Sequence, residues 1–143
     1  MDNIAREQNY DGAIVYGGPG YGFDVGGESF SAAAHYNPNT ERVVVFDGGM
    51  NDSLDSLLAH EFSHYRWHKL EQNNYEVYDN LVNTAINDLN HLSTWSPTAY
   101  SDAYWKSAMA GNTSYYDITN AINETFAEIS RLDHIANGKD SRI

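Results

Sequence analysis

The sequence predicts a small α+β protein in which short strands of a twisted N-terminal sheet precede a helical C-terminal part. Over residues 1–50, mainly β, short runs of β-branched, aromatic and small residues alternate with glycine-rich turns. Over residues 51–143, mainly α, apolar residues recur every three or four positions, which is the period of a helix with one buried face. With 143 residues, the chain 1–143 is expected to form a single domain that buries a substantial core.

The N-terminal strands are expected at residues 13–16, around 21–25, and in a hairpin whose arms are residues 29–36 and 42–46. Between the arms, residues 37–40 (Asn-Pro-Asn-Thr) have the composition of a turn. The second arm is continuously apolar at its centre, which is typical of a strand covered on both faces. The first arm is less apolar and suits the edge of the sheet.

Four helices are expected in the C-terminal part. The first three span residues 54–70, 75–92 and 98–109, and the last is capped by Asp117 or Thr119 and runs to about residue 136. Its core face is expected to comprise Ile118, Ile122, Phe126, Ile129 and Leu132. The candidate caps of the first helix are Asn51, Asp52 and Ser53. The aromatic stretch 93–114 is expected either to wall a cleft or to close a small core.

Composition and charge narrow the classes of function. The chain has no cysteine, which excludes a disulfide scaffold and a cysteine-ligated zinc site and leaves histidine and carboxylate as strong metal ligands. A formal net charge of −12 disfavours binding to nucleic acid or to anionic membranes. The first residues lack the pattern of a signal peptide, so we expect a cytoplasmic protein or one released or delivered by another route. The abundance of tyrosine and asparagine suits a bacterial or phage origin.

The most informative stretch is the motif His-Glu-Phe-Ser-His at residues 60–64, within the first expected helix. Residues four apart lie one turn apart on the same helical face, so His60 and His64 can offer two imidazole nitrogens to one zinc ion. Glu61 lies beside that face, where its carboxylate can take a proton from a metal-activated water. The apolar side of this helix predicts that it is packed, which favours a metal site over a chance pair of surface histidines.

A zinc site of this kind needs a third ligand. His68 continues the spacing but lies a turn too far along the helix for all three histidines to meet one ion. Glu124 and Glu128 lie four residues apart in residues 123–128, Asn-Glu-Thr-Phe-Ala-Glu. Glu124 can ligate the metal, and Glu128 can accept a hydrogen bond from the free ring nitrogen of a ligand histidine. The alternatives are Glu128 as the ligand, Asp88 as the ligand, or a solvated acidic helix edge without a metal role.

The two motifs together, His-Glu-x-x-His at 60–64 and Asn-Glu-x-x-x-Glu at 123–128, resemble the gluzincin pattern of thermolysin-like metallopeptidases. The Glu-x-x-Ala-Glu spelling also resembles the catalytic domain shared by anthrax lethal factor and the Pro-Pro endopeptidases. The resemblance covers the middle and the end of the chain. It implies a small zincin-like domain with one zinc ion per chain, held by His60, His64 and Glu124, while Glu128 is hydrogen-bonded to a ligand histidine.

The resulting expectation is a zinc-dependent endopeptidase that cleaves a peptide or protein with Glu61 as general base. Since zincins generally place the strand before the active helix beside the cleft, residues 32–36 are expected to pair with an extended peptide unless a loop covers them. In lethal-factor-like domains a tyrosine shortly before the ligand glutamate stabilises the oxyanion. The matching offset falls here on Asp117, so the neighbouring Tyr115 and Tyr116 are the candidates. The other candidates are His91, His134 and Tyr100.

The sequence is also compatible with two other classes of function. The chain could be a non-catalytic, zinc-stabilised binding or structural domain, although such a site has no need of Glu61 beside its ligands. It could also be an acidic interaction protein that binds no metal, in which case a chelator would leave its melting temperature unchanged. We expect a monomer with neither a nucleic-acid nor a membrane partner.

Overall fold

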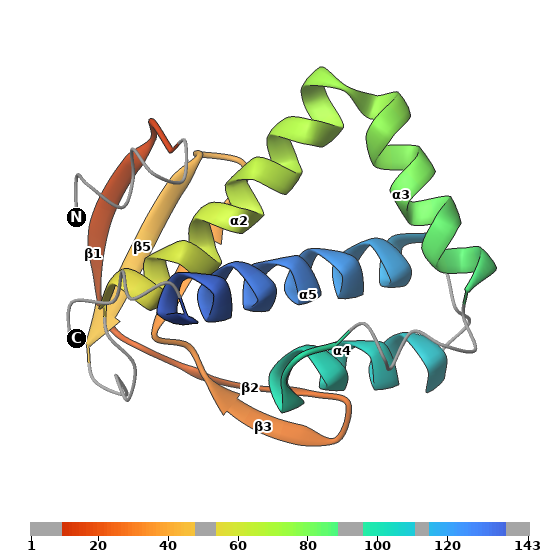
Figure 1. The fold of residues 1–143 in the computed structure, drawn as a ribbon. Helices are drawn as coiled ribbons and strands as arrows, with labels where there is room; N and C mark the ends of the chain where they lie inside the picture. The colour runs from red at the N-terminus through yellow and green to blue at the C-terminus, as the bar shows by residue number, and fades with distance from the viewer. Residues whose placement is uncertain (1–9, 48–53, 89–95, 111–114, 137–143) are drawn as a thin grey trace.

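The computed structural model describes residues 10–47, 54–88, 96–110 and 115–136 of the chain. In these residues a short β-sheet and a β-ribbon are followed by four helices, which confirms the predicted α+β class (Figure 1). The strands are β1 (Ala13–Pro19), β2 (Gly22–Val25), β3 (Glu28–Ser31), β4 (Ala34–Asn37) and β5 (Arg42–Asp47). The helices are α2 (Leu54–Asn73), α3 (Tyr75–Asn87), α4 (Ala99–Ala110) and α5 (Tyr115–Ala136).

The three-stranded sheet has the order β1-β5-β4, so β4 lies at an edge, as predicted. β1 runs parallel to β5 and β4 runs antiparallel to it, with Ile14 and Tyr36 on either side of Val43. Val43 is fully buried against α2. Val44, on the opposite face, is only half-buried, so that face of the central strand is less covered than its apolar run predicts.

The predicted hairpin arm 29–36 is divided between two strands, which corrects the expected pairing. Its first part lies in β3 and pairs antiparallel with β2 in a separate two-stranded ribbon, and only its second part, in β4, pairs with β5. Gly26 and Gly27 have φ angles of +59° and +79°. Two successive residues with positive φ make a tight hairpin turn, and this turn folds β3 back on β2 before the chain reaches the sheet.

The helices agree with the predicted ones except near their ends. α2 continues to Asn73, a few residues beyond its expected end. α5 begins at Tyr115, so Asp117 and Thr119 lie inside the helix and are not its caps. An acidic residue is favoured both at the cap and in the first turn, and the sequence alone does not distinguish these two positions. The predicted caps of the first helix and the predicted residues 89–92 of the second lie outside the described residues.

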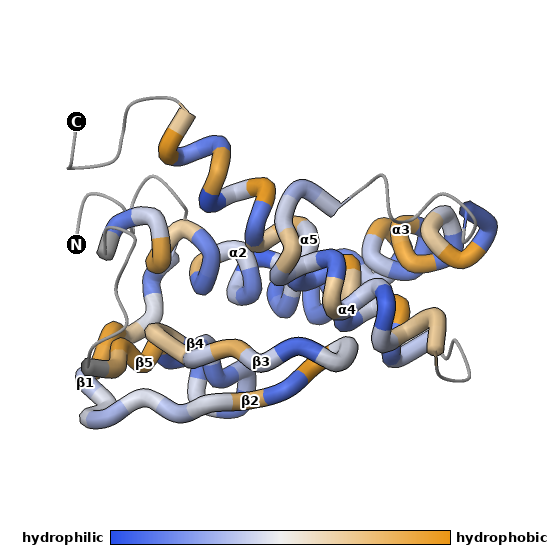
Figure 2. The backbone as a smooth tube through the Cα atoms, turned by 90° about the horizontal axis from the view of Figure 1, so that it is seen from below, coloured by the Kyte–Doolittle hydropathy of each residue, from blue (hydrophilic) through white to orange (hydrophobic). Residues whose placement is uncertain are grey.

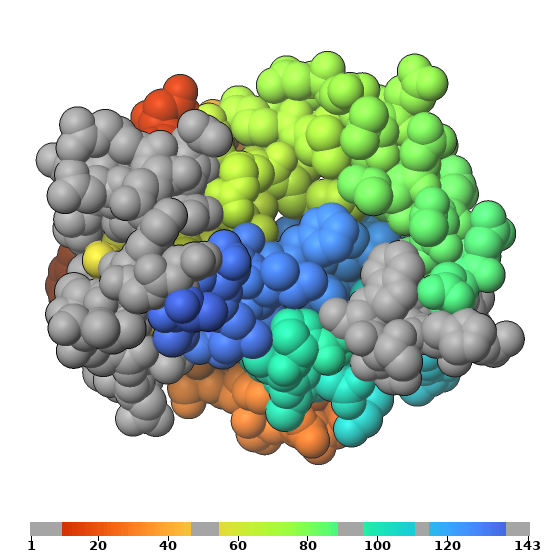
Figure 3. Space-filling model, in the orientation of Figure 1, coloured from red at the N-terminus to blue at the C-terminus, as the bar shows by residue number. Residues whose placement is uncertain are grey.

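The buried face of α5 agrees with the predicted one in its first half, and differs from it at Ile129 and at the two glutamates. Ile118 and Ile122 are buried as expected, but Ile129 is 45% exposed. Because α2 packs against α5, Glu124 and Glu128 are buried between the two helices. Ile129 follows Glu128 by about 100° around the helix and therefore faces solvent. Figure 3 shows α5 at the surface between α2 and α4 on this side of the molecule.

The apolar core has two parts that meet on α2. The part among the helices comprises Trp67, Tyr78, Val82, Ala85, Trp105, Ala108, Ile118, Ala121 and Ile122. The part between α2 and the strands comprises Tyr10, Tyr36, Val43, Leu58, Ala59, Phe62 and Tyr65. Figure 2 shows the strands as one layer with the helices on one side of it. α2 is thus covered on two sides, and the histidines of its motif face α5.

Candidate metal centre

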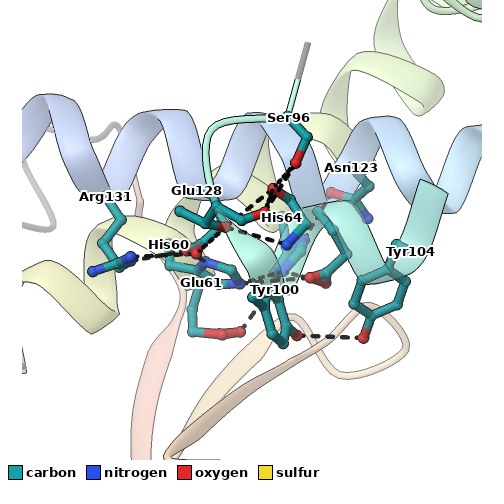
Figure 4. Close-up of polar contacts among 12 residues, drawn as sticks. His60, Glu61, His64, Ser96, Tyr100, Tyr104, Asn123, Glu128 and Arg131 are labelled. Atoms are coloured by element: carbon teal, nitrogen blue, oxygen red, sulfur yellow. Dashed lines mark hydrogen bonds and ion pairs between the residues drawn. The ribbon is translucent and has the colours of Figure 1, made fainter. Parts of the chain in front are cut away.

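Helices α2 and α5 bring three metal-ligating side chains together. His60 and His64 lie one turn apart on α2, and their Nε2 atoms are 3.2 Å apart (Figure 4). Glu124 on α5 places Oε1 3.0 Å from His64 Nε2 and Oε2 3.7 Å from His60 Nε2. Ligand atoms from all three residues lie within 4.8 Å of one another, and the side chains are only 10–12% exposed. This buried group could hold a metal ion.

The outer nitrogen of each histidine is held by an acceptor on α5. His60 Nδ1 is 2.9 Å from Glu128 Oε2, and His64 Nδ1 is 2.7 Å from Asn123 Oδ1. Both partners are hydrogen-bond acceptors, so both Nδ1 atoms carry the proton. This tautomer leaves the Nε2 lone pairs directed into the group, which is the form of histidine that binds a metal.

Two Nε2 lone pairs that face each other at 3.2 Å would repel, so the point where these atoms converge favours a proton or a cation. Burial alone would lower the pKa of His60, but the neighbouring carboxylates of Glu124 and Glu128 and the charge of Glu61 raise it to about 10. Burial opposes ionisation of Glu124, but the two histidines hold the pKa of its carboxyl well below the usual range. The raised pKa of His60 favours a proton at this position, and a bound cation would compete with that proton.

Glu128 is fixed by contacts on both of its oxygens. Oε2 meets His60 and accepts from Arg131 Nε at 2.8 Å, while Oε1 accepts from Thr98 Oγ1 at 2.8 Å. Thr98 also accepts from the Ser101 N–H at 3.2 Å and so ties the start of α4 to this carboxylate. Burial would raise the pKa of Glu128, but the hydrogen bonds from His60 and Arg131 lower it to about 2, so Glu128 is an anion that orients His60.

Three residues of this arrangement are not among the sequence-based predictions: Thr98, Asn123 and Arg131. Arg131 follows Glu128 by three positions, and side chains at this spacing on a helix are neighbours, so the sequence could have predicted this ion pair. Asn123 directly precedes Glu124 in the same short motif, and this adjacency could have indicated that Asn123 also lies at the site. Thr98 carries no such signal, because it reaches Glu128 from a distant part of the chain, just before α4.

Replacing Asn123 with alanine is expected to weaken metal binding by about 10–100-fold, because His64 loses the acceptor that fixes its tautomer and ring orientation. Asn123→Asp keeps an acceptor at this position and should bind metal nearly as well as the wild type. Competition with a fluorescent chelator would measure both affinities. Equal affinities for Asn123→Ala and the wild type would show that this hydrogen bond does not orient the ligand.

A cleft of about 930 Å³ opens beside the metal-ligating group. It is lined by residues of the β2–β3 ribbon, β4, α2, α4 and α5, including Tyr21, Phe23, Ala34, Tyr36, Tyr100 and Tyr104. Glu61 also lines it, is 6% exposed, and has Oε1 3.9 Å from His64 Nε2. The structure therefore places the Glu61 carboxylate, which is not one of the candidate ligands, beside those ligands and an open cavity.

Within the described residues no strand pairs with the outer edge of β4, and this edge borders the cleft. The Phe46 N–H donates to the Ala33 carbonyl at 3.0 Å, and the register of β4 against β5 continues without a shift. Hydrogen-bonded and non-hydrogen-bonded pairs alternate along an antiparallel ladder, so His35 also bonds β5. The main-chain N–H and C=O groups of Ala34 and Tyr36 consequently point away from β5, toward the free edge.

The other sequence candidates lie at different places. The Tyr115 hydroxyl donates to Asp79 Oδ1 at 2.8 Å on the surface, and Tyr116 reaches the cleft but is 76% exposed. Tyr100 is closer to the ligands, with its ring centre 5.7 Å from that of His60. Burial and the charge of Glu124 raise the pKa of Tyr100 far above its usual range, so its hydroxyl keeps its proton.

The alternative ligands do not join the group among the described residues. Asp88 and His68 are not part of it, and His68 instead lies 3.8 Å from Glu41. Glu128 contacts the outer nitrogen of His60. His134 is buried without a hydrogen-bond partner in the described part of the chain, and His91 lies outside the described residues.

The described part of the aromatic stretch both walls the cleft and contributes to the core. Tyr100 and Tyr104 line the cleft, while Trp105 belongs to the core.

Comparison with protein-family models, with curated proteins and with solved structures finds no match to the chain. Across the described residues, no helix has both the length and the apolar character that are needed to cross a membrane.

Proposed function

We propose that the protein is a zinc-dependent endopeptidase with Glu61 as its general base. The observation that carries the proposal is the buried convergence of His60, His64 and Glu124 beside a cleft that also contains Glu61. Two imidazoles and a carboxylate with a further position open are a donor set of catalytic zinc sites. A base next to the ligands is a feature that a purely structural metal site does not need.

The spacing of the donor atoms supports zinc as the metal. Two nitrogen ligands at about 2.0–2.1 Å from a tetrahedral zinc ion stand about 3.3 Å apart, and the two Nε2 atoms are 3.2 Å apart. Glu124 Oε2 is buried without a hydrogen-bond partner among the described residues, a deficit that a cation would remove. When bound, zinc would polarise a substrate carbonyl and lower the pKa of water.

The proton transfers of the reaction are assigned to Glu61. Its carboxylate is buried at the cleft beside the ligands, where it can accept a proton from the attacking water as the water oxygen bonds to the carbonyl carbon. The same proton then passes from Glu61 to the leaving nitrogen as the C–N bond breaks. His60 and His64 keep their Nδ1 protons throughout, because Glu128 and Asn123 hold them.

An extended peptide is the substrate that suits the cleft best. The free main-chain groups of Ala34 and Tyr36 could hydrogen-bond to a peptide laid beside β4 as an added strand. This pairing uses the peptide backbone and makes few demands on its side chains. The net charge of −12 favours neutral or cationic peptides over acidic ones.

Replacing Ala34 with proline is expected to raise KM for peptides roughly three- to tenfold, equivalent to about 1 kcal/mol for one hydrogen bond. Proline removes the N–H that points to the free edge, a position where edge strands tolerate it, so zinc content and Tm should stay close to wild type. Ala34→Ser retains the N–H and serves as the control. An unchanged KM in a correctly folded Ala34→Pro protein would rule out strand addition at this position.

The decisive experiment combines metal analysis with a peptide library. Protein purified without added metal is expected to contain one zinc per chain, to cleave library peptides, to lose this activity with a chelator and to regain it with stoichiometric zinc. Zinc without cleavage of any peptide would instead support a non-catalytic, zinc-stabilised domain. No zinc, together with a Tm that a chelator leaves unchanged, would overturn the proposal and favour an acidic interaction protein.

A further inference from the structure

Thr98 belongs both to the start of α4 and to the surroundings of the metal-ligating group. It directly precedes α4, and its carbonyl accepts a helical hydrogen bond from the Asp102 N–H at 3.0 Å. Its hydroxyl oxygen accepts from the Ser101 N–H at 3.2 Å. Threonine is favoured at the N-cap, because its side-chain oxygen satisfies a backbone N–H that has no partner within the helix. Thr98 is therefore the N-cap of α4.

The hydroxyl proton of Thr98 serves a second contact. Its Oγ1 lies 2.8 Å from Glu128 Oε1. Arg131 donates to both oxygens of the same carboxylate, from Nε to Oε2 at 2.8 Å and from Nη2 to Oε1 at 3.3 Å. A carboxylate paired in this way with a guanidinium is ionised and can only accept hydrogen bonds. The direction of the bond is therefore fixed: Thr98 donates and Glu128 accepts.

Two hydrogen bonds thus connect a candidate ligand to the cap of α4. Glu128 Oε2 is 2.9 Å from His60 Nδ1, while Oε1 of the same carboxylate accepts from Thr98. Figure 4 shows the contacts of Glu128 with His60 and Arg131. Because a carboxylate is planar and rigid, its two oxygens cannot be placed independently. A shift of Thr98 therefore also moves the oxygen that orients the His60 ring.

The first turn of α4 is part of the wall of the cleft. Tyr100 lies in this turn, lines the cleft and has its ring centre 5.7 Å from that of His60. The same ring meets Phe23 and Phe30 of the β2–β3 ribbon edge-on, at 6.3 and 5.0 Å, and such edge-to-face contacts are favourable. The place of the ribbon beside the cleft consequently depends on the place of the first turn of α4.

The second half of α4 is held by different contacts. Trp105 is 2% exposed, and its Nε1 donates to Thr125 Oγ1 at 2.8 Å. Both Trp105 and Ala108 belong to the apolar core among the helices. Ser101, in the first turn, is also buried, but its hydroxyl lies among the hydroxyls of Ser96 and Thr98. Apolar packing thus fixes the second half of α4, whereas the polar contacts of the first turn lead to Glu128.

We infer that Thr98 is a positioning residue that couples zinc binding to the placement of the cleft wall formed by the first turn of α4 and the β2–β3 ribbon. When the His60 ring is fixed by its ligation, Glu128 is fixed with it, and the cap of α4 is held in turn. Coupling of this kind is reciprocal, so a well-placed first turn strengthens zinc binding by the same factor by which zinc stabilises that turn. This inference rests on the zinc site of the proposed function and not on peptide hydrolysis.

The first test measures zinc affinity by competition with a fluorescent chelator. Thr98→Val keeps the branched shape of the side chain and removes its hydroxyl. It should bind zinc about three- to tenfold more weakly, because Glu128 loses a hydrogen bond that orients it. Thr98→Ser retains the hydroxyl and should bind zinc as the wild type does. Ser96→Ala is the matched control, since it removes a nearby hydroxyl that bonds to Ser101 and to the Thr98 carbonyl.

The second test measures the same coupling at α4, by amide hydrogen exchange of the wild-type chain in zinc and in chelator. At exchange times of seconds, amides exchange by local opening and not by global unfolding. Zinc is expected to slow exchange in residues 99–103 about three- to tenfold, and to leave residues 105–110 unchanged because the core protects them in both buffers. Thr98→Val should lose this zinc dependence in residues 99–103. The wild-type comparison alone already tests the coupling, whether or not a variant folds.

Wild-type zinc affinity in a folded Thr98→Val protein with a lowered Tm would show that Thr98 only caps α4, and would overturn the coupling while leaving the zinc site intact. Equal weakening in Ser96→Ala and Thr98→Val would attribute the loss to local packing and also contradict the inference. Exchange in residues 99–103 that is the same in zinc and in chelator would overturn it as well. A wild-type protein that binds no zinc would overturn the proposed function together with this inference, and elemental analysis identifies that result separately.

Discussion

Glu61→Gln is expected to retain its zinc and to lose hydrolysis, with kcat/KM lower by a factor of about 10²–10⁴. Glutamine has nearly the same shape as glutamate but cannot accept a proton from water. Glu61 is not among the residues that converge on the metal position, so its loss should leave metal affinity almost unchanged. Initial rates on a peptide identified by library screening, together with elemental analysis of the same preparation, measure the two properties side by side.

The matched control for this variant is Glu76→Gln, which removes one carboxylate from an exposed position on α3 and should have wild-type activity. This control separates the role of Glu61 from the small change in net charge. An active Glu61→Gln protein would assign the proton transfers to another group and remove the main argument for catalysis. Loss of zinc in Glu61→Gln would instead place Glu61 among the ligands.

Glu124→Gln is expected to lose zinc and the stability that zinc confers, whereas Glu128→Gln should bind zinc about 10–100-fold more weakly. Zinc at a thousandfold above its Kd adds about 4 kcal/mol to the free energy of unfolding, which corresponds to roughly 15 °C in Tm for a domain of this size. The wild type should show this shift between chelator and zinc, and Glu124→Gln should show almost none. Differential scanning calorimetry in the two buffers gives the comparison directly.

The difference between these variants follows from their contacts. Glu124 presents oxygens toward both Nε2 atoms, so its carboxylate takes part in holding the ion itself. Glu128 meets the outer nitrogen of His60, and glutamine can still offer an oxygen there. If Glu124→Gln and the wild type hold equal zinc, then the assignment of Glu124 as a ligand is wrong, and Glu128 or Asp88 becomes the candidate to replace next.

The sequence by itself determined two kinds of feature: the spacing of side chains within one helix, and the division of the chain into strands and helices by hydrophobic periodicity. Because a helix advances 3.6 residues per turn, the spacing of His60 and His64 places both rings on one face wherever that helix packs. The spacing of Glu124 and Glu128 does the same for α5. The division into strands and then helices likewise follows from local periodicity, and the structure agrees with it.

The features that only the tertiary structure decided are contacts between elements that are distant in the chain. The parallel pairing of β1 with β5, the hydrogen bond from Thr98 to Glu128 and the position of Tyr100 against His60 leave no local pattern in the sequence. The sequence-based choice of Tyr115 relied on distance along the chain, whereas its hydroxyl is held by Asp79 of α3. Local periodicity sets which face of a helix a side chain occupies, but the packing of buried faces sets which other element that face meets.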